Sequence, residues 1–119
     1  MLADPQSVTV GGSTISIPRV TEVGNYTEYY SADGITSLRI TQASSANKRR
    51  HSLTLRTAKI AADPISGLNS RKLSNITVTV DRPVDGFTVT EIKDQLVALA
   101  TLLTASSAAT AIKIIQGEK

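Results

Sequence analysis

Two short segments near the start of the chain alternate apolar and polar residues, which is the pattern of β-strands with one buried face. They are residues 7–10 (SVTV) and 13–17 (STISI), and Gly11-Gly12 joins them. Glycine adopts positive φ without steric cost, so this pair favours a tight two-residue turn. We therefore predict a β-hairpin that places Val8 opposite Ile15 and ends at Pro18.

The same period of two recurs in four later segments, which predicts an antiparallel sheet of four or five strands. These strands are expected at 25–31, 35–43, 50–56 and 75–80. After the third segment the apolar residues move from odd positions (Leu53, Leu55) to even positions (Ala58, Ile60). This shift indicates a bulge or the end of regular pairing near Thr57. Residues 61–70 are rich in Pro, Gly, Asn and Ser and are predicted to form a loop.

After residue 86 the apolar period changes from two to 3.6, which is typical of helices. Thr88 and Glu91 have the spacing of a capping box, in which each side chain bonds the backbone N–H of the other. A second helix is expected to begin at Ser106 or Ser107 and to end at Gly117. At 119 residues we predict a single α+β domain, with a hairpin at 1–20, a sheet at 25–81 and two helices at 88–117.

The net charge of +3 conceals a strong asymmetry along the chain. Residues 34–80 carry eight Lys or Arg and one acidic residue, a balance of 8 − 1 = +7, and the remainder carries 5 − 9 = −4. Such segregation favours a negatively charged partner for the central strands, although a merely solvated charged surface remains the alternative.

Several kinds of chemistry have no support in the sequence. There is no cysteine, there is one histidine, and no phosphate-binding glycine loop, nucleophile elbow or metal-binding cluster is present. We therefore predict a protein that is not an enzyme and needs no cofactor or metal. No signal sequence is recognisable, and the apolar stretch 92–103 is interrupted and too short to span a bilayer, so no membrane partner is expected.

The strand pattern places hydroxyl, amide and arginine side chains together on one face of the sheet. Arginine binds phosphate oxygens, and Ser, Thr and Asn can contact riboses and bases. The set that shares a face by alternation is Arg39, Thr41, Arg50, Ser52, Thr54, Arg56, Asn75 and Thr77. The pattern alone supports RNA binding and an ordinary solvated face about equally, and the scarcity of aromatic residues argues against base stacking.

The predicted helices are too few to cover the opposite, apolar face. Two helices of about a dozen residues cover a five-stranded sheet poorly. We therefore expect a second copy of the chain to supply further helices, which makes an obligate homodimer the expected state.

The residues that carry a family resemblance are the turn Gln42–Arg50 (QASSANKRR), the strand Asn75–Val80 and the terminal segment Thr88–Lys119. Together with the Gly11-Gly12 hairpin they resemble, in the same order over nearly the whole chain, the coat proteins of single-stranded RNA bacteriophages of the levivirus type. The resemblance implies dimers with interlocked helices that assemble into an icosahedral shell in the bacterial host cytoplasm. It also implies that the sheet faces the genomic RNA inside the virion. In some members of the family the same face acts as a translational repressor through an RNA hairpin, which the resemblance extends to this chain as an expectation.

Carried over residue by residue, the resemblance implies an RNA-facing set. Its members are Ser37, Arg39, Thr41, Ser44, Ser45, Lys48, Arg50, Ser52, Thr54, Asn75 and Thr77, with Arg56 in the place of a basic residue missing at Thr54. Leu73 stands where the family aligns an aromatic residue that stacks on a base. The 61–70 loop would correspond to the one gathered around the shell's symmetry axes.

Two other readings stay open on the residues alone. One is a non-viral α+β RNA-binding module, which would use the same polar face. The other is a surface adhesin or pilin-like domain, which the missing signal sequence disfavours. Particle size separates a coat protein from a module, because only the former forms a large assembly.

Overall fold

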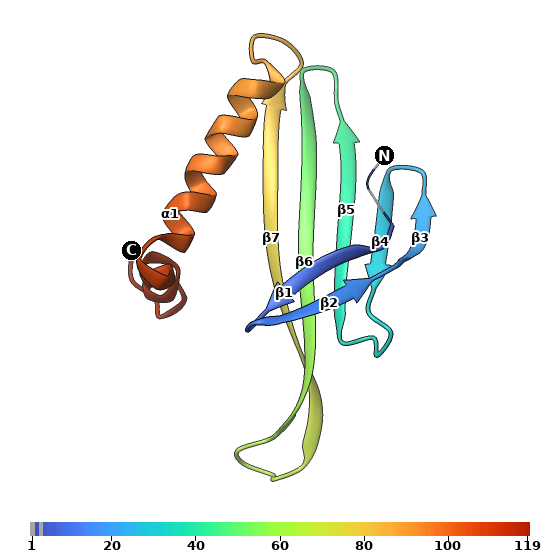
Figure 1. The fold of residues 1–119 in the computed structure, drawn as a ribbon, viewed down its shortest axis with the longest axis vertical. Coiled ribbons are helices and arrows are strands. Elements are labelled where there is room, and N and C mark those ends of the chain that lie inside the picture. Colours follow the sequence, from blue (N-terminus) through green and yellow to red (C-terminus); the bar gives the residue numbers. More distant parts are fainter. Residues whose placement is uncertain (1, 3) are drawn as a thin grey trace. The chain divides into compact units, whose positions relative to one another are not determined.

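The computed structural model describes residues 2 and 4–119, which divide into two compact units. The first ends at Asp81 and contains the strands, and the second, Arg82–Lys119, is helical (Figure 1). Antiparallel strands followed by helix make this an α+β chain, as predicted.

The strand unit consists of a two-stranded hairpin and a five-stranded sheet. The hairpin is formed by β1 (Gln6–Val10) and β2 (Ser13–Ile17). The sheet has the order β3 (Arg19–Val23), β4 (Tyr26–Tyr30), β5 (Thr36–Ser44), β6 (Lys48–Ala62) and β7 (Asn69–Pro83). Because the strands pair in chain order, each connection is local.

The N-terminal hairpin has the register that its sequence predicts. Val8 lies opposite Ile15, and Gly11 and Gly12 both have positive φ, at 60° and 85°. That pair of angles belongs to a turn whose twist matches the twist of the strands. The hairpin crosses one face of the sheet, and β2 contacts β5 (Figure 1).

The predicted number of five strands is confirmed, but one of them had no predicted residue range. β3 begins at Arg19, immediately after Pro18, and pairs with β4 through a register irregularity between Arg19 and Thr21. The irregularity breaks the alternation of this short segment, so the period of two is not visible in it.

The two longest strands are longer than expected. Regular pairing of β6 with β5 ends at Thr57, as the phase change indicates, but β6 itself continues to Ala62. Since β7 already begins at Asn69, the connection is shorter than the predicted 61–70 loop. Asp63 organises it, because its carboxylate accepts the backbone N–H of Ile65 (2.8 Å) and lies within 3.4 Å of that of Ser66.

The C-terminal element α1 (Val89–Ile115) contains two helical segments separated by a kink. Residues 105–108 leave the helical conformation, and Ser106, Ser107 and Ala108 have positive φ. Neither serine therefore has the extended backbone of an ordinary N-cap, which corrects the predicted start of the second helix. The helix stops at Gly117, as predicted, where the N–H groups of Gly117 and Glu118 bond the carbonyls of Ile114 and Lys113.

The start of α1 follows the predicted cap with one difference. The Thr88 hydroxyl accepts the backbone N–H of Glu91 at 3.2 Å. The Glu91 carboxylate accepts the Thr88 hydroxyl, also at 3.2 Å, instead of a backbone N–H. The threonine cap is confirmed, and the reciprocal half of the capping box is replaced by a bond between side chains.

By length and composition alone, Val89–Ile115 is apolar enough to cross a membrane, contrary to the sequence prediction that judged 92–103 too short. The kink at 105–108 divides this segment, so it is not one continuous helix. Helices that pack against other protein satisfy the same test, and the finding by itself does not place the chain at a membrane.

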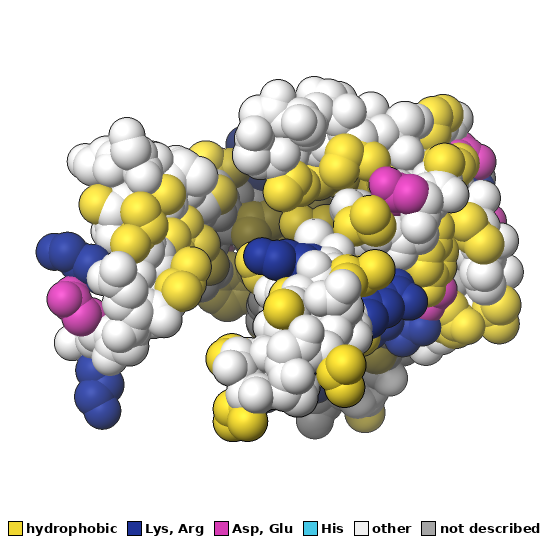
Figure 2. All heavy atoms as spheres, turned by 90° about the horizontal axis from the view of Figure 1, so that it is seen from below, with side chains coloured by type: hydrophobic (Ala, Val, Ile, Leu, Met, Phe, Trp, Pro, Cys, Tyr) yellow, Lys and Arg dark blue, Asp and Glu magenta, His cyan; other side chains and the backbone are white. Residues whose placement is uncertain are grey.

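Little of the apolar surface of either unit is buried within it. In the described residues the buried hydrophobic side chains are Ile17, Tyr29 and Ala58. Leu53 is 42% and Ile76 is 62% exposed, and no described residue of α1 is buried. Figure 2 shows hydrophobic side chains at the surface of both units. A chain that leaves so much apolar area in water has surface available for association.

Candidate nucleic-acid interface

The sheet has a polar face, made by alternate residues of β4, β5, β6 and β7. The register pairs Arg39 with both Glu28 and Thr54, and Ser37 with both Tyr30 and Arg56. Directly opposite residues of neighbouring strands point to the same side of a sheet. Side-chain bonds extend the face to β7, since Thr54 bonds Thr77 at 3.2 Å and Arg56 bonds Asn75 at 3.0 Å.

Nine of the twelve residues expected to face RNA lie on this polar face. They are Ser37, Arg39, Thr41, Arg50, Ser52, Thr54, Arg56, Asn75 and Thr77. The structure therefore brings together side chains from three strands that are separated by up to 40 residues in sequence.

The other three expected residues lie where β5 turns into β6. Ser44 is opposite Arg49 and lines a hollow on each side of the strands. Ser45 and Lys48 close the turn, with the Ser45 N–H donating to the Lys48 carbonyl at 2.8 Å. These three residues therefore border the polar face at one end of the sheet, and Ser44 does not share the alternation of Thr41 and Arg39.

Each arginine of the polar face has a partner within the protein. The Arg39 guanidinium donates to Glu28, with Nε 2.7 Å from Oε1, and lies 4.8 Å from the centre of the Tyr26 ring. The Arg50 Nε donates to Asp81 Oδ1 at 2.7 Å. Arg56 donates to the neutral amide oxygen of Asn75.

These partners change the charge of the face. The charge balance of residues 34–80 leaves out Glu28 and Asp81. In the folded sheet both acidic residues lie on the same face as the arginines, because Glu28 is opposite Arg39 and Asp81 bonds Arg50. Arg39, Arg50 and Arg56 against Glu28 and Asp81 give 3 − 2 = +1 on the face itself, with Lys48 adding one more at its end. The face is much less positive than the balance of +7 suggests.

The ion pairs also shift the pKa values of Arg39 and Asp81. The hydrogen bond from Arg50 is the main reason that the pKa of Asp81 lies below its usual value, and the charges of Arg50 and Lys48 act in the same direction. The bond to Glu28 raises the pKa of Arg39, so this arginine stays charged. Since the Arg39 and Arg50 side chains are more than half exposed, the guanidinium groups remain accessible to an incoming phosphate.

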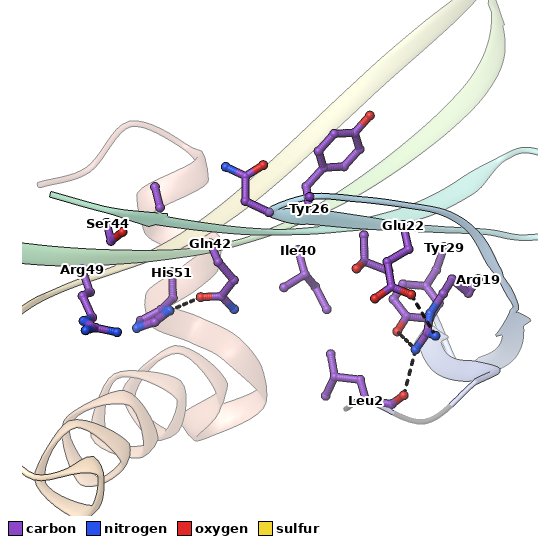
Figure 3. Close-up of a pocket in the computed structure, with 14 residues that line it drawn as sticks. Leu2, Arg19, Glu22, Tyr26, Tyr29, Ile40, Gln42, Ser44, Arg49 and His51 are labelled. Carbon is purple, nitrogen blue, oxygen red and sulfur yellow. Dashed lines mark hydrogen bonds and ion pairs between the residues drawn. The ribbon is translucent and has the colours of Figure 1, made fainter.

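The contribution of β4 to this face was not predicted from the sequence. Tyr26 and Tyr30 lie opposite Thr41 and Ser37, so the expectation that aromatic residues are scarce there was wrong. Figure 3 shows Tyr26 on the other side of the strands from Ile40 and Gln42. The signal available in the sequence was the alternation of residues 26–30, which places Tyr26 and Tyr30 on one face and Tyr29 on the other.

The opposite side of the sheet contains a hollow with a volume of about 560 Å³. Arg19, Tyr29, Ile40 and His51 are among the residues that line it (Figure 3). His51 bonds Gln42, and Arg19 bonds the Leu2 carbonyl and the Tyr29 hydroxyl at 3.0 and 3.3 Å. His51 therefore lies in a hydrogen-bonded position of a largely apolar face, and no group of acidic, His or Cys side chains in the described residues could hold a metal.

Comparisons with known proteins give one clear result, which concerns the fold. No family model and no curated protein sequence matches the chain. Among solved structures, the virus-like particle of bacteriophage AVE019 matches with a TM-score of 0.79 and 17% identity, over 100% of this chain and 98% of that one. The virus-like particle of Beihai levi-like virus 21 matches at 0.72 and 14%, over 98% and 94%.

The capsid protein of bacteriophage GA is a third match, with a TM-score of 0.59 and 18% identity over 96% of this chain and 95% of the other. The resemblance inferred from the sequence is thus confirmed at the level of the fold. The chain has the fold of levivirus-type coat proteins over its whole length.

Proposed function

We propose that this chain is the coat protein of a single-stranded RNA bacteriophage. One observation carries the proposal: the fold agrees, along essentially the full length of both chains, with proteins that form virus-like particles. Agreement over the whole chain matters because the strand unit and the helical segment, and not one of them alone, are shared with those proteins.

The exposed apolar surface supports self-association. Leu53 and Ile76 on the sheet and Leu99 on α1 are all at least two-fifths exposed, which is costly for a chain in water. Two copies that interlock their helices would cover this surface in an obligate homodimer, and dimers would form the icosahedral shell of the virion. Assembly would take place in the cytoplasm of the bacterial host.

The polar face supports contact with the genome. It presents exposed arginines, hydroxyls and an amide on one surface without an enclosing site, which suits a long, flexible polyanion better than a small molecule. Its small net charge favours moderate, salt-sensitive RNA binding. Repression through a specific RNA hairpin would be a second use of the same face and would need further contacts to bases.

Expression of the chain alone in bacteria tests the proposal. A coat protein should elute from a sizing column as particles of megadalton mass that absorb strongly at 260 nm, and electron microscopy should show closed shells. The rival is a non-viral RNA-binding module, which the polar face alone would also support. A module would elute as a monomer or dimer, and recovery of only such small species would reject the coat-protein proposal.

A further inference from the structure

The chain contains two Asp-Gly pairs, Asp33-Gly34 and Asp85-Gly86. In such a pair the main chain can isomerise, because glycine has no side chain to keep its amide nitrogen away from the neighbouring carboxyl group. The sequence presents the two pairs as equivalent, whereas the structure surrounds them differently.

Hydrogen bonds hold both reacting groups of the first pair. The Gly34 N–H donates to the Ser31 carbonyl at 3.0 Å. The Asp33 carboxylate accepts the Ser31 hydroxyl and the backbone N–H of Ile35, the latter at 3.0 Å. These bonds, the hydroxyl's above all, lower the pKa of Asp33, so its side chain stays a carboxylate, from which oxygen leaves with difficulty. The fold therefore protects Asp33-Gly34.

The second pair has no such restraint. Asp85-Gly86 lies in the exposed connection between β7 and α1, within the helical unit. In the part of the chain that the structure describes, no group donates to the Asp85 carboxylate and the Gly86 N–H has no acceptor. No atom lies within 4 Å of the position that a β-carbon of Gly86 would take. The Gly86 nitrogen and the Asp85 carboxyl carbon are therefore free to meet.

We propose that Asp85 is a site of spontaneous isomerisation to isoaspartate, through a cyclic imide formed with Gly86. The Gly86 nitrogen loses its proton and attacks Cγ of Asp85, and the new N–Cγ bond closes a five-membered ring. The hydroxyl of the protonated side chain leaves with that proton as water. A second water then opens the ring, either at Cγ, which restores aspartate, or at the main-chain carbonyl, which leaves the chain running through Cγ. One water is lost and one is gained, so the reaction needs no oxidant, cofactor or enzyme.

The product differs from the original chain in two ways. It lengthens the connection between β7 and α1 by one backbone carbon, and it moves the carboxylate onto the α-carbon shortly before the Thr88 cap. The reaction requires neither RNA nor assembly, so this inference is independent of the proposed function. Its failure would leave the coat-protein proposal as it stands, and the reverse is also true.

The test compares the two pairs within one protein. The purified protein is kept at neutral pH and physiological temperature for several weeks, digested, and analysed by electron-transfer mass spectrometry, which distinguishes isoaspartate from aspartate of equal mass. Isoaspartate should form at residue 85 about tenfold faster than at residue 33, the factor expected when hydrogen bonds on both reacting groups must first open. Equal rates, or a faster reaction at residue 33, would overturn the proposal.

The unfolded chain is the control for the role of the structure. In concentrated guanidinium chloride neither pair keeps its hydrogen bonds, so the two rates should become similar. A ratio that does not change on unfolding would show that neighbouring residues, and not the fold, set it, which refutes the inference. Reaction of Asp85 in the unfolded chain alone would refute it too, because the fold would then protect both pairs.

Substitutions at residue 85 test the site directly. Asp85→Glu keeps the charge but would have to close a six-membered ring, which is much slower. It should remove the product at residue 85 and leave that at residue 33 unchanged. Total isoaspartate, measured by methylation with isoaspartyl methyltransferase, should fall to match, and an unchanged total would place the modification elsewhere and reject the site. Asp85→Asn should react faster than the wild type, because an amide loses ammonia without first taking up a proton on a carboxylate. That variant therefore reports a change of charge alone only when freshly purified.

Discussion

Arg50 and Asp81 form an ion pair on the polar face, with Arg50 Nε 2.7 Å from Asp81 Oδ1, although 31 residues separate them in the chain. The pair joins β6 to the end of β7 and places a carboxylate beside an arginine that would otherwise face a phosphate. It therefore limits the positive charge that the face can offer to RNA.

Removal of that carboxylate should strengthen RNA binding. Asp81→Asn keeps the shape of the side chain, raises the charge of the face by one and releases Arg50 to bind a phosphate. We expect tighter binding at low salt and a steeper salt dependence, by about 0.7 in the slope of log K against log salt for one added phosphate contact. Fluorescence anisotropy with a single-stranded RNA measures both.

Asp85→Asn is the control for this variant, because it makes the same change of charge in the turn after β7, outside the strand unit. It should leave the slope unchanged. Equal effects of both substitutions would mean that net charge alone, and not the release of Arg50, governs the binding.

The ionisation of Asp81 should reveal the same pair. Its pKa is lowered in the folded protein, so its contribution to stability is present above the unfolded pKa, about 3.9, and is lost as the pH falls through the lower folded value. An NMR titration of the Asp81 carboxyl carbon should therefore have a midpoint below the usual range. In Arg50→Gln the midpoint should return toward that range, and an unchanged midpoint would show that Arg50 is not the cause.

The helix should tolerate a new charge only on the side away from its apolar stripe. Leu99 recurs at helical spacing with Ile92, Leu96 and Leu103, which form that stripe, and it is 49% exposed in the single chain. Leu99→Asp should prevent dimers and particles, because it would bury an unpaired carboxylate in the contact between copies. Sizing-column elution measures the loss. Thr101→Asp places the same charge roughly 200° around the helix and should still assemble. Assembly of Leu99→Asp would contradict the proposed packing.

The hairpin turn should depend on glycine. Gly12 has φ of 85°, where a β-carbon is unfavourable even though no atom lies within 4 Å of the position it would take. Gly12→Ala should therefore lower stability by roughly 1 kcal/mol, through the backbone and without a steric clash. Chemical unfolding measures the change. Ser13→Ala, at the neighbouring strand position, should cost clearly less, and equal losses would indicate that the turn conformation is not the reason.

The sequence predicted the strand alternation well because each side chain of a strand points to the face opposite its neighbour's. That rule alone correctly placed Arg39, Thr54 and Asn75 on one surface. It failed for β3, where an irregular register hides the period. The break between the two helical segments near Ser106 was predicted, but the positive φ values of residues 106–108 were not, because no glycine signals them.

By itself, then, the sequence determined the order of the elements and which residues of a strand share a side, since both follow from local backbone geometry. Only the tertiary structure decided which residues of different strands lie opposite or beside one another. The pairing of Glu28 with Arg39 and of Asp81 with Arg50, and the position of Tyr30 beside Arg56 and Leu73, depend on register between distant segments. A tight turn sets the register of the Gly11-Gly12 hairpin, which the sequence predicted, but register between strands joined by longer connections depends on how whole strands align in the sheet.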